Sequence, residues 1–332
     1  MTGGGTGSGA ASITGNLTNP TNSQQTATYT ITPTSTLCGA NATFTVTVTV
    51  NPTPTVSAMS NTTCSGVFFN VTPVNGTNGI VPGGTTYSWS VPTVTGGLTG
   101  GASGSSATTI TGTLVNPTNS QQTATYTITP TSGTCVGSTF TVTVTVNPSA
   151  VIGAMTNTTC SGLFFSVTPV NGTNGIVPTG TTYTWNAPGG NGTLTGGNAG
   201  SGSTITGTLT NTTNIQQNAF YSVTPTSGSC VGTTFAITVT INPSAVINAM
   251  TGVSCGGVFF NVTPVNGTNG IVPAGTTYGW SAPSVTGSMT GGASGSSAST
   301  ITGTLINPTN SQQTATYTIT PTSTLCLSLI HI

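Results

Sequence analysis

The stretch QTATYTITPTSGTCVGSTFTVTVTVNP, residues 122–148, alternates polar and apolar side chains with a period of two. Alternation with this period is typical of β-strands that bury one face. A turn signal, SGTC, interrupts the alternation at 132–135, so the sequence predicts two neighbouring strands joined by a tight turn. The apolar residues that share the buried face are Ala124, Tyr126 and Ile128 in the first strand and Phe140, Val142, Val144 and Val146 in the second.

The same pattern extends upstream through residues 55–148, where turn signals rich in Gly, Asn and Pro separate short extended segments. No segment shows a helical period. We expect an all-β, immunoglobulin-like sandwich of about seven antiparallel strands, with one tryptophan of the third strand in its core. The other expected strands are 55–59, 67–74, 85–91 and 109–114, and the other expected turns or flexible connections are 75–79, 96–106 and 116–122.

The whole unit repeats about every 95 residues. The seventeen residues NPTNSQQTATYTITPTS stand identically at 19–35, 116–132 and 307–323, with a looser copy at 211–227. A period of this length matches one small β-sandwich, so we expect tandem sandwiches arranged as an extended rod. The aromatic residues expected in the successive cores are Trp89, Trp185, Trp280, Tyr126, Tyr221 and Tyr317.

Repeat boundaries fall where Asn-Pro ends a strand, after TVTVNP and TVTINP. Met1 aligns with Met289 in the middle of a repeat, and the tail LSLIHI resembles the translation of a sequencing-library adapter. The tail contains the single histidine, His331, and is expected to form no part of the fold. We expect the C-terminal part of a truncated repeat at 1–54, full repeats at 55–148 and 149–244, a repeat lacking its last strand at 245–326, and a non-native tail at 327–332.

Lys, Arg, Asp and Glu are absent from all 332 residues. Without carboxylates or lysine, the side chains that most acid–base and nucleophilic catalysis needs are missing, so we expect no enzyme, no cofactor and no metal site. Without Lys or Arg, phosphates cannot be neutralised, and we expect no nucleic-acid partner. No apolar run approaches the roughly 20 residues that span a bilayer, so we expect no membrane insertion within this segment.

Several motifs resemble a known family. They are TCSG at 63–66 and 159–162, with SCGG at 254–257, the TTYxW strand, the ITGTLxNxTN segment, and C…FTVTVTVNP at the end of the repeat. Together they resemble the PKD-like, immunoglobulin-like tandem repeats of very large cell-surface proteins of Bacteroidetes-type bacteria, and the resemblance covers residues 1–326. It implies a secreted, surface-held adhesin or fibre, with copies of itself or adjacent repeats as partners.

Seven cysteines, two per complete repeat, suggest disulfides in an extracellular chain. In the expected sandwich, Cys64 and Cys135 lie at opposite poles, roughly 26 Å apart. A disulfide needs Cα atoms about 4.4–6.8 Å apart, which favours bonds across repeat junctions. One hypothesis therefore pairs Cys64 with Cys230 and Cys160 with Cys326, and leaves Cys38, Cys135 and Cys255 for repeats outside this segment. The competing hypotheses are the pairs Cys64–Cys135 and Cys160–Cys230 within repeats, and free thiols.

Asn-x-Ser/Thr triplets are frequent and provide candidate glycan acceptors, although an Asn- and Thr-rich sequence also forms them by chance. The candidates are Asn16, Asn41, Asn61, Asn70, Asn75, Asn157, Asn171, Asn191, Asn211, Asn261 and Asn266.

Together these features predict an extracellular structural and adhesive protein, a stalk or filament on a bacterial surface. Two alternatives remain open. One is a self-polymerising fibre subunit completed by strand donation between chains. The other is a binding module whose loops at one pole of the sandwich recognise a glycan or a host surface. The near-identity of the repeats favours a spacer over a specific reader.

Overall fold

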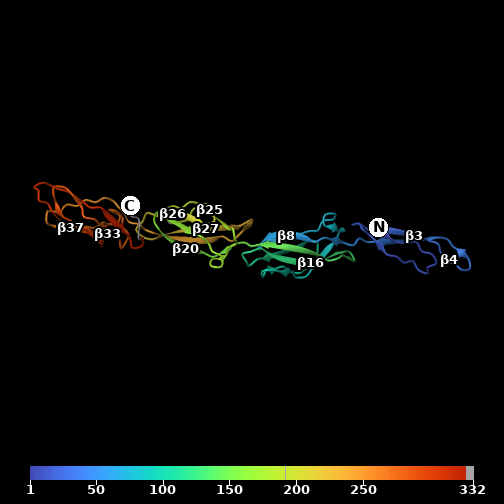
Figure 1. Ribbon diagram of the computed structural model, residues 1–332. Coiled ribbons are helices and arrows are strands. Elements are labelled where there is room, and N and C mark those ends of the chain that lie inside the picture. Colours follow the sequence, from blue (N-terminus) through green and yellow to red (C-terminus); the bar gives the residue numbers. More distant parts are fainter. Residues whose placement is uncertain (191, 327–332) are drawn as a thin grey trace. The chain divides into compact units, whose positions relative to one another are not determined.

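The computed structural model describes residues 1–190 and 192–326, and every regular element in them is a β-strand. The chain forms two compact units, one of Met1–Ser149 with Ser227–Cys230 and one of Ala150–Thr226 with Val231–Ile332. Asn191, His331 and the rest of 327–332 lie outside the described residues. Within each unit the strands group by repeat, and the two full repeats are sandwiches (Figure 1).

The first full repeat is a sandwich of two sheets with a small additional ribbon. The larger sheet has the order β14 (Gly104–Ala107), β11 (Thr86–Trp89), β16 (Gln122–Ser132), β18 (Phe140–Asn147) and β8 (Met59–Cys64), with β12 (Thr93–Val94) and β17 (Cys135–Val136) also paired to β16. The smaller sheet has the order β13 (Thr99–Gly100), β15 (Ile110–Val115) and β9 (Phe68–Val71). The ribbon pairs β7 (Thr55–Val56) with β10 (Gly79–Ile80).

The core lies between the two sheets and is formed by the alternating apolar residues that define the strands. Tyr126 pairs across the sheet with Val142, and both are fully buried. The ring of Phe69, from the smaller sheet, packs on the ring of Tyr126 with centroids 5.7 Å apart. Opposite faces of the same strands carry threonine, which is polar and β-branched and therefore suits the solvent side of a strand.

One strand pairing differs from the expected antiparallel arrangement. Residues Met59–Cys64 run parallel to β18, in a register that places Met59 opposite Val142 and Cys64 opposite Asn147. The first part of the repeat therefore serves two partners, because Thr55–Val56 pairs with β10 and the chain then crosses to the edge of the larger sheet.

Two other expectations were wrong in detail. The Gly-rich segment 96–106 is not only a flexible connection, because it contributes the edge strand β13 to one sheet and most of β14 to the other. The third strand ends at Trp89, two residues before its predicted end, so Val91 is 66% exposed and not part of the core.

The second full repeat has the same architecture. Its larger sheet has the order β20 (Met155–Cys160), β29 (Phe235–Asn242), β27 (Gln217–Ser227), β23 (Thr182–Trp185) and β25 (Gly200–Gly202), with β28 (Cys230–Val231) beside β27. Its smaller sheet has the order β21 (Phe164–Val167), β26 (Ile205–Asn211) and β24 (Leu194–Gly196), and its ribbon pairs β19 (Val151–Ile152) with β22 (Gly175–Ile176). The parallel pair recurs, with Cys160 opposite Asn242.

The N-terminal partial repeat is a set of short ribbons. It contains the hairpin of β3 (Gln25–Ile31) and β6 (Phe44–Val50), the pair β1 (Thr2–Gly3) and β2 (Leu17–Thr18), and the pair β4 (Thr34–Ser35) and β5 (Gly39–Ala40). Within the described residues β6 has no second neighbour, whereas its counterpart β18 lies between β16 and β8.

The last repeat keeps the smaller sheet and part of the larger one. Its strands are β30 (Val246–Ile247) with β32 (Gly270–Ile271), β31 (Phe259–Val262) with β37 (Ile301–Ile306) and β35 (Thr290–Gly291), β36 (Gly295–Ala298) with β33 (Thr277–Trp280) and β39 (Ile319–Thr322), and β34 (Ser284–Val285) with β38 (Ala315–Thr316). Residues 250–255, which correspond to β8, form no strand, and no counterpart of β18 lies among the described residues. The parallel edge strand thus forms only where its partner is present.

Candidate functional site

The two cysteines of one repeat lie at opposite ends of its larger sheet. Cys64 stands opposite Asn147, the last residue of β18, whereas Cys135 pairs with Ser132 in the hairpin that precedes β18. Eight residues of strand cover about 26 Å, several times the Cα separation that a disulfide allows. The pairing of Cys64 with Cys135 within one repeat is therefore excluded by the fold itself.

Two disulfides connect cysteines of successive repeats. Cys64 bonds to Cys230 with a Cα–Cα distance of 5.5 Å, and Cys160 bonds to Cys326 with a Cα–Cα distance of 5.7 Å. Both distances lie in the ordinary range for a cystine. These are the pairs that the junction hypothesis names, and the within-repeat pairs Cys64–Cys135 and Cys160–Cys230 are not formed.

The remaining three cysteines are free thiols. Cys135 is half-buried, and Cys38 and Cys255 are exposed. By the repeat, Cys38 and Cys135 occupy the hairpin position of Cys230, and Cys255 occupies the strand-end position of Cys64. Each free thiol therefore stands where a junction cystine forms in the two complete cases.

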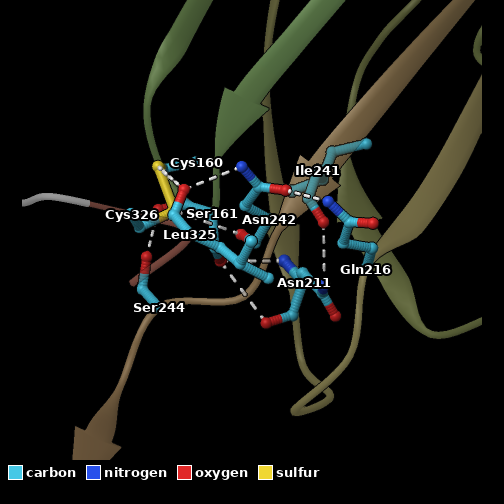
Figure 2. The surroundings of a disulfide bond; sticks show 9 residues. All are labelled: Cys160, Ser161, Asn211, Gln216, Ile241, Asn242, Ser244, Leu325 and Cys326. Carbon is cyan, nitrogen blue, oxygen red and sulfur yellow. Dashed lines mark hydrogen bonds between the residues drawn. A yellow bond between two sulfur atoms is a disulfide. The ribbon is translucent and has the colours of Figure 1, made fainter. Parts of the chain in front are cut away.

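Polar contacts surround the Cys160–Cys326 cystine, and Asn242 is at their centre (Figure 2). Its side-chain Nδ2 donates a hydrogen bond of 2.8 Å to the backbone oxygen of Leu325 in the following repeat. Its backbone oxygen accepts a hydrogen bond from the backbone N–H of Ser161 at 2.9 Å and lies 3.7 Å from Sγ of Cys326. One buried asparagine thus contacts both chain segments that the cystine joins.

The Asn242 side chain is held in place by a residue of its own repeat. Nε2 of Gln216 donates to its Oδ1 at 2.7 Å, which fixes the orientation of the amide (Figure 2). The same bond recurs in the first two repeats, from Gln121 to Asn147 and from Gln24 to Asn51, both at 2.8 Å. Because the bond forms even at Asn51, where no cystine is present, each of these three repeats carries a preorganised end.

Asn211 supports the same end of the repeat from inside. Its Nδ2 donates to the backbone oxygens of Ile215 at 2.7 Å and Ile241 at 3.1 Å, and its backbone N–H donates to Oγ of Ser161 at 2.9 Å. The side chain is 2% exposed. Asn211 is therefore wrong as a candidate glycan acceptor, because its amide nitrogen is buried and committed to two hydrogen bonds.

The other described glycan candidates differ in access. Asn61 and Asn157 are half-buried within the parallel edge strands β8 and β20. Those that are exposed are Asn16, Asn41, Asn70, Asn75, Asn171, Asn261 and Asn266. Asn75, Asn171 and Asn266 also accept backbone hydrogen bonds through Oδ1 in their turns, which leaves the amide nitrogen free.

The expected core aromatics lie where the alternation places them, with one exception. Trp89, Trp185 and Trp280 are 7–8% exposed, and Tyr126 and Tyr221 are fully buried. Tyr317 is only half-buried, in the repeat whose larger sheet is incomplete.

The buried tyrosine hydroxyls have no hydrogen-bond partner. This holds for Tyr126, Tyr221 and Tyr317, as far as the described residues extend. Burial raises the pKa of Tyr221 to about 12 and also raises the pKa of Tyr126, because the charged phenolate is poorly solvated there. These hydroxyls lie inside the sandwich and are shielded from any solute.

No group of three or more side chains of the metal-binding types gathers anywhere in the described part of the chain. None of its elements is a helix long and apolar enough to cross a membrane. Among those residues, the junction is therefore the place where polar, covalent and packing features converge. Asn242 and Gln216 were not singled out from the sequence, although both stand at fixed positions of the repeat, Asn242 in INP and Gln216 in QQ.

Comparison with known proteins identifies the repeat. The PKD-like domain family matches residues 1–54, 61–150, 157–245 and 253–328. The matched segments follow the same order as the expected repeats, and the last three begin somewhat later than the boundaries at 55, 149 and 245. No curated protein matches the chain.

Solved structures resemble the chain only distantly. An endo-fucoidan hydrolase of glycoside hydrolase family 107 shares 13% identity at a TM-score of 0.22, over 67% of this chain and 34% of that one. The N-terminal four immunoglobulin domains of Dscam1 share 10% identity at 0.23, over 56% and 44%. Mouse clustered PcdhgC3 EC1-3 shares 12% identity at 0.24, over 69% and 78%. The chain spans about a third of the first of these structures, and likenesses of this size say nothing about its function.

Proposed function

Because the chain belongs to the PKD-like domain family, and because cystines join its successive repeats, we propose that it is a structural and adhesive protein that forms an extracellular stalk or filament. The observation that carries the proposal is the junction at Cys160–Cys326. A covalent bond, a buried asparagine and a preorganised glutamine restrain two neighbouring sandwiches at one point. Restraint of this kind suits a spacer, whereas a reader of ligands needs exposed and varied loops.

The composition supports a structural role. With no Asp, Glu, Lys or Arg in the sequence, stability and solubility should hardly respond to salt or to pH near neutrality. We propose that the chain is not an enzyme, since the residue types that carry most catalysis are missing. Zero net charge also removes repulsion between molecules and favours association of the chain with copies of itself.

The cystines support a location in an oxidising, extracellular environment, because disulfides persist there and are rare in reducing compartments. By the resemblance of its motifs, the surface is that of a Bacteroidetes-type bacterium. Antibodies raised against the repeats should label intact source cells. Labelling that appears only after the cells are permeabilised would contradict the proposal.

Self-polymerisation by strand donation is the second candidate. It is favoured by two observations on the described residues: β6, which has the sequence FTVTVTV of β18, has no second neighbour there, and residues 250–255 form no strand. A strand from another molecule could occupy that place. A synthetic peptide with the sequence of residues 136–148 should then bind the purified chain and break up its oligomers. Oligomers that persist at saturating peptide would argue against donation.

A further inference from the structure

We infer that the junction cystines divide the array into two continuous covalent tracks that carry tension past the sandwiches, so that the stalk does not lengthen when a repeat unfolds. The first track runs from Thr55 to Cys64, crosses the disulfide and continues from Cys230 to Cys255. The second runs from Cys135 to Cys160 and crosses the next disulfide to Cys326. Neither track enters residues 65–134 or 161–229, which form the rest of the two full repeats.

Each track alternates between two kinds of strand. The first uses the edge strand β8 in one repeat and then, after the disulfide, the last strand β29 of the next. The second uses β18 and then, through the peptide connection, the edge strand β20. The parallel pairing of the edge strand with the last strand is therefore what brings both tracks together in every complete repeat.

The parallel pairs also hold the tracks side by side. Six residues of β8 face six of β18, and six of β20 face six of β29, in unbroken register. Because the two strands of a pair point the same way, tension enters both at the same end and leaves both at the other. The pair is then loaded along its length, and its ladder hydrogen bonds need not open one by one.

The tracks have little slack. From Thr55 to Cys64 the chain advances nine residues, which can span at most about 32 Å when fully stretched. Eight of the ten residues from Thr55 to Cys64 already lie in the extended strands β7 and β8. A strand is close to its greatest length before any force is applied, so the track can extend by only a few ångströms per repeat.

Most of each sandwich lies off the tracks. In the first full repeat, residues 65–134 contain β9, β11, β15 and β16, which supply most of the core. Unfolding this part leaves the distance between Thr55 and Cys64 unchanged, because the covalent path avoids it. The core thus sets the shape of the repeat, while the backbone of the tracks and the disulfides bear the load.

The free cysteines stand at positions that would continue the tracks into further repeats. Cys135 begins the second track and Cys255 ends the first. The purpose of the tracks rests on the proposed stalk function, since only a stalk is pulled along its length. Their mechanics rests on the disulfides alone, so a chain found elsewhere than on a cell surface would behave identically under force.

The inference can be tested by pulling single molecules of the full chain. Handles are attached by azidophenylalanine at Thr55 and Val253, two exposed positions on the first track. Cys38, Cys135 and Cys255 are replaced by serine to prevent exchange. The oxidised path contains nine residues before the disulfide and 23 after it, so we expect full extension at about 110 Å with no long unfolding step.

Reduction gives the contrasting result. Opening Cys64–Cys230 restores a sequence separation of 166 residues to the path, and the stretched length should grow by roughly 550–600 Å, in steps as repeats unfold. The variant C64S/C230S should behave as the reduced chain does. The matched variant C160S/C326S should behave as the oxidised chain does, because that disulfide lies on the other track. Long unfolding steps in the oxidised chain would overturn the inference.

Discussion

Replacing Tyr126 and Tyr221, two fully buried tyrosines whose hydroxyls lack a hydrogen-bond partner, by phenylalanine should stabilise the protein. The Oη atoms of Tyr126 and Tyr221 are buried without a hydrogen-bond partner, and the rings pack against Phe69 and Phe165. Leaving a buried hydroxyl unpaired costs about 1–3 kcal/mol, whereas the ring contacts survive the substitution. Each repeat should therefore gain about 1–3 kcal/mol in free energy of unfolding. A gain of 1 kcal/mol raises Tm by about 4–8 °C in a domain of 60–100 residues.

Differential scanning calorimetry of Y126F/Y221F against the unsubstituted chain measures the shift. Tyr183 provides the control, because its residue is similarly buried but its hydroxyl is not a fully buried group that lacks a partner, so Y183F should not raise Tm. A fall in Tm for Y126F/Y221F would refute the reasoning, since it would mean that the two hydroxyls make stabilising hydrogen bonds.

Three further results are expected. Burial raises the pKa of Tyr221 to about 12 from the usual 10, so between these pH values the folded state keeps a proton that the unfolded state releases. The denaturation midpoint should therefore be constant up to about pH 9 and fall from pH 10 to 12. An unchanged midpoint at pH 12 would contradict this. Gly101 has φ +75, and an added Cβ would lie 2.8 Å from Oη of Tyr126, so urea titrations should show that G101A lowers the free energy of unfolding by at least about 2 kcal/mol. The control G97A, at a position with φ +69 and open space around it, should lower it by only about 1 kcal/mol. Phe68, Phe164 and Phe259 are each more than 60% exposed on the smaller sheet of their repeat, where they could form lateral contacts between copies of the chain. Replacing all three by threonine should weaken self-association at least about tenfold in sedimentation experiments, because burying one phenylalanine contributes about 1.5–3 kcal/mol. Unchanged association would argue against these contacts.

Strands with strict alternation could be predicted from sequence, because the period directly reports a buried and a wet face. This holds for Phe140–Asn147, where the expected apolar positions Phe140, Val142, Val144 and Val146 are all buried. The edge strand Met59–Cys64 escaped prediction because its sequence, MSNTTC, shows no apolar alternation. Its formation depends on a partner strand about 80 residues away in the chain, as residues 250–255 show by remaining irregular.

The junction could be predicted in part. Strand length places Cys64 and Cys135 too far apart to bond in the expected sandwich, which favoured pairs between repeats over the pairs within repeats and over free thiols. The hydrogen bond from Asn242 to Leu325 depends on how two repeats meet, and no periodicity carries that information. The burial of Asn211 was missed for a similar reason, because a glycosylation triplet describes three residues and not the sandwich end that encloses them.

The central claim, that cystines join successive repeats, is tested most directly by mapping disulfide-linked peptides under non-reducing conditions. Trypsin has no site in this chain, so the digest needs proteases that cut at aromatic or aliphatic residues. We expect one linked pair that contains Cys64 and Cys230 and another that contains Cys160 and Cys326. A peptide pair that links Cys64 to Cys135, or Cys160 to Cys230, would contradict it.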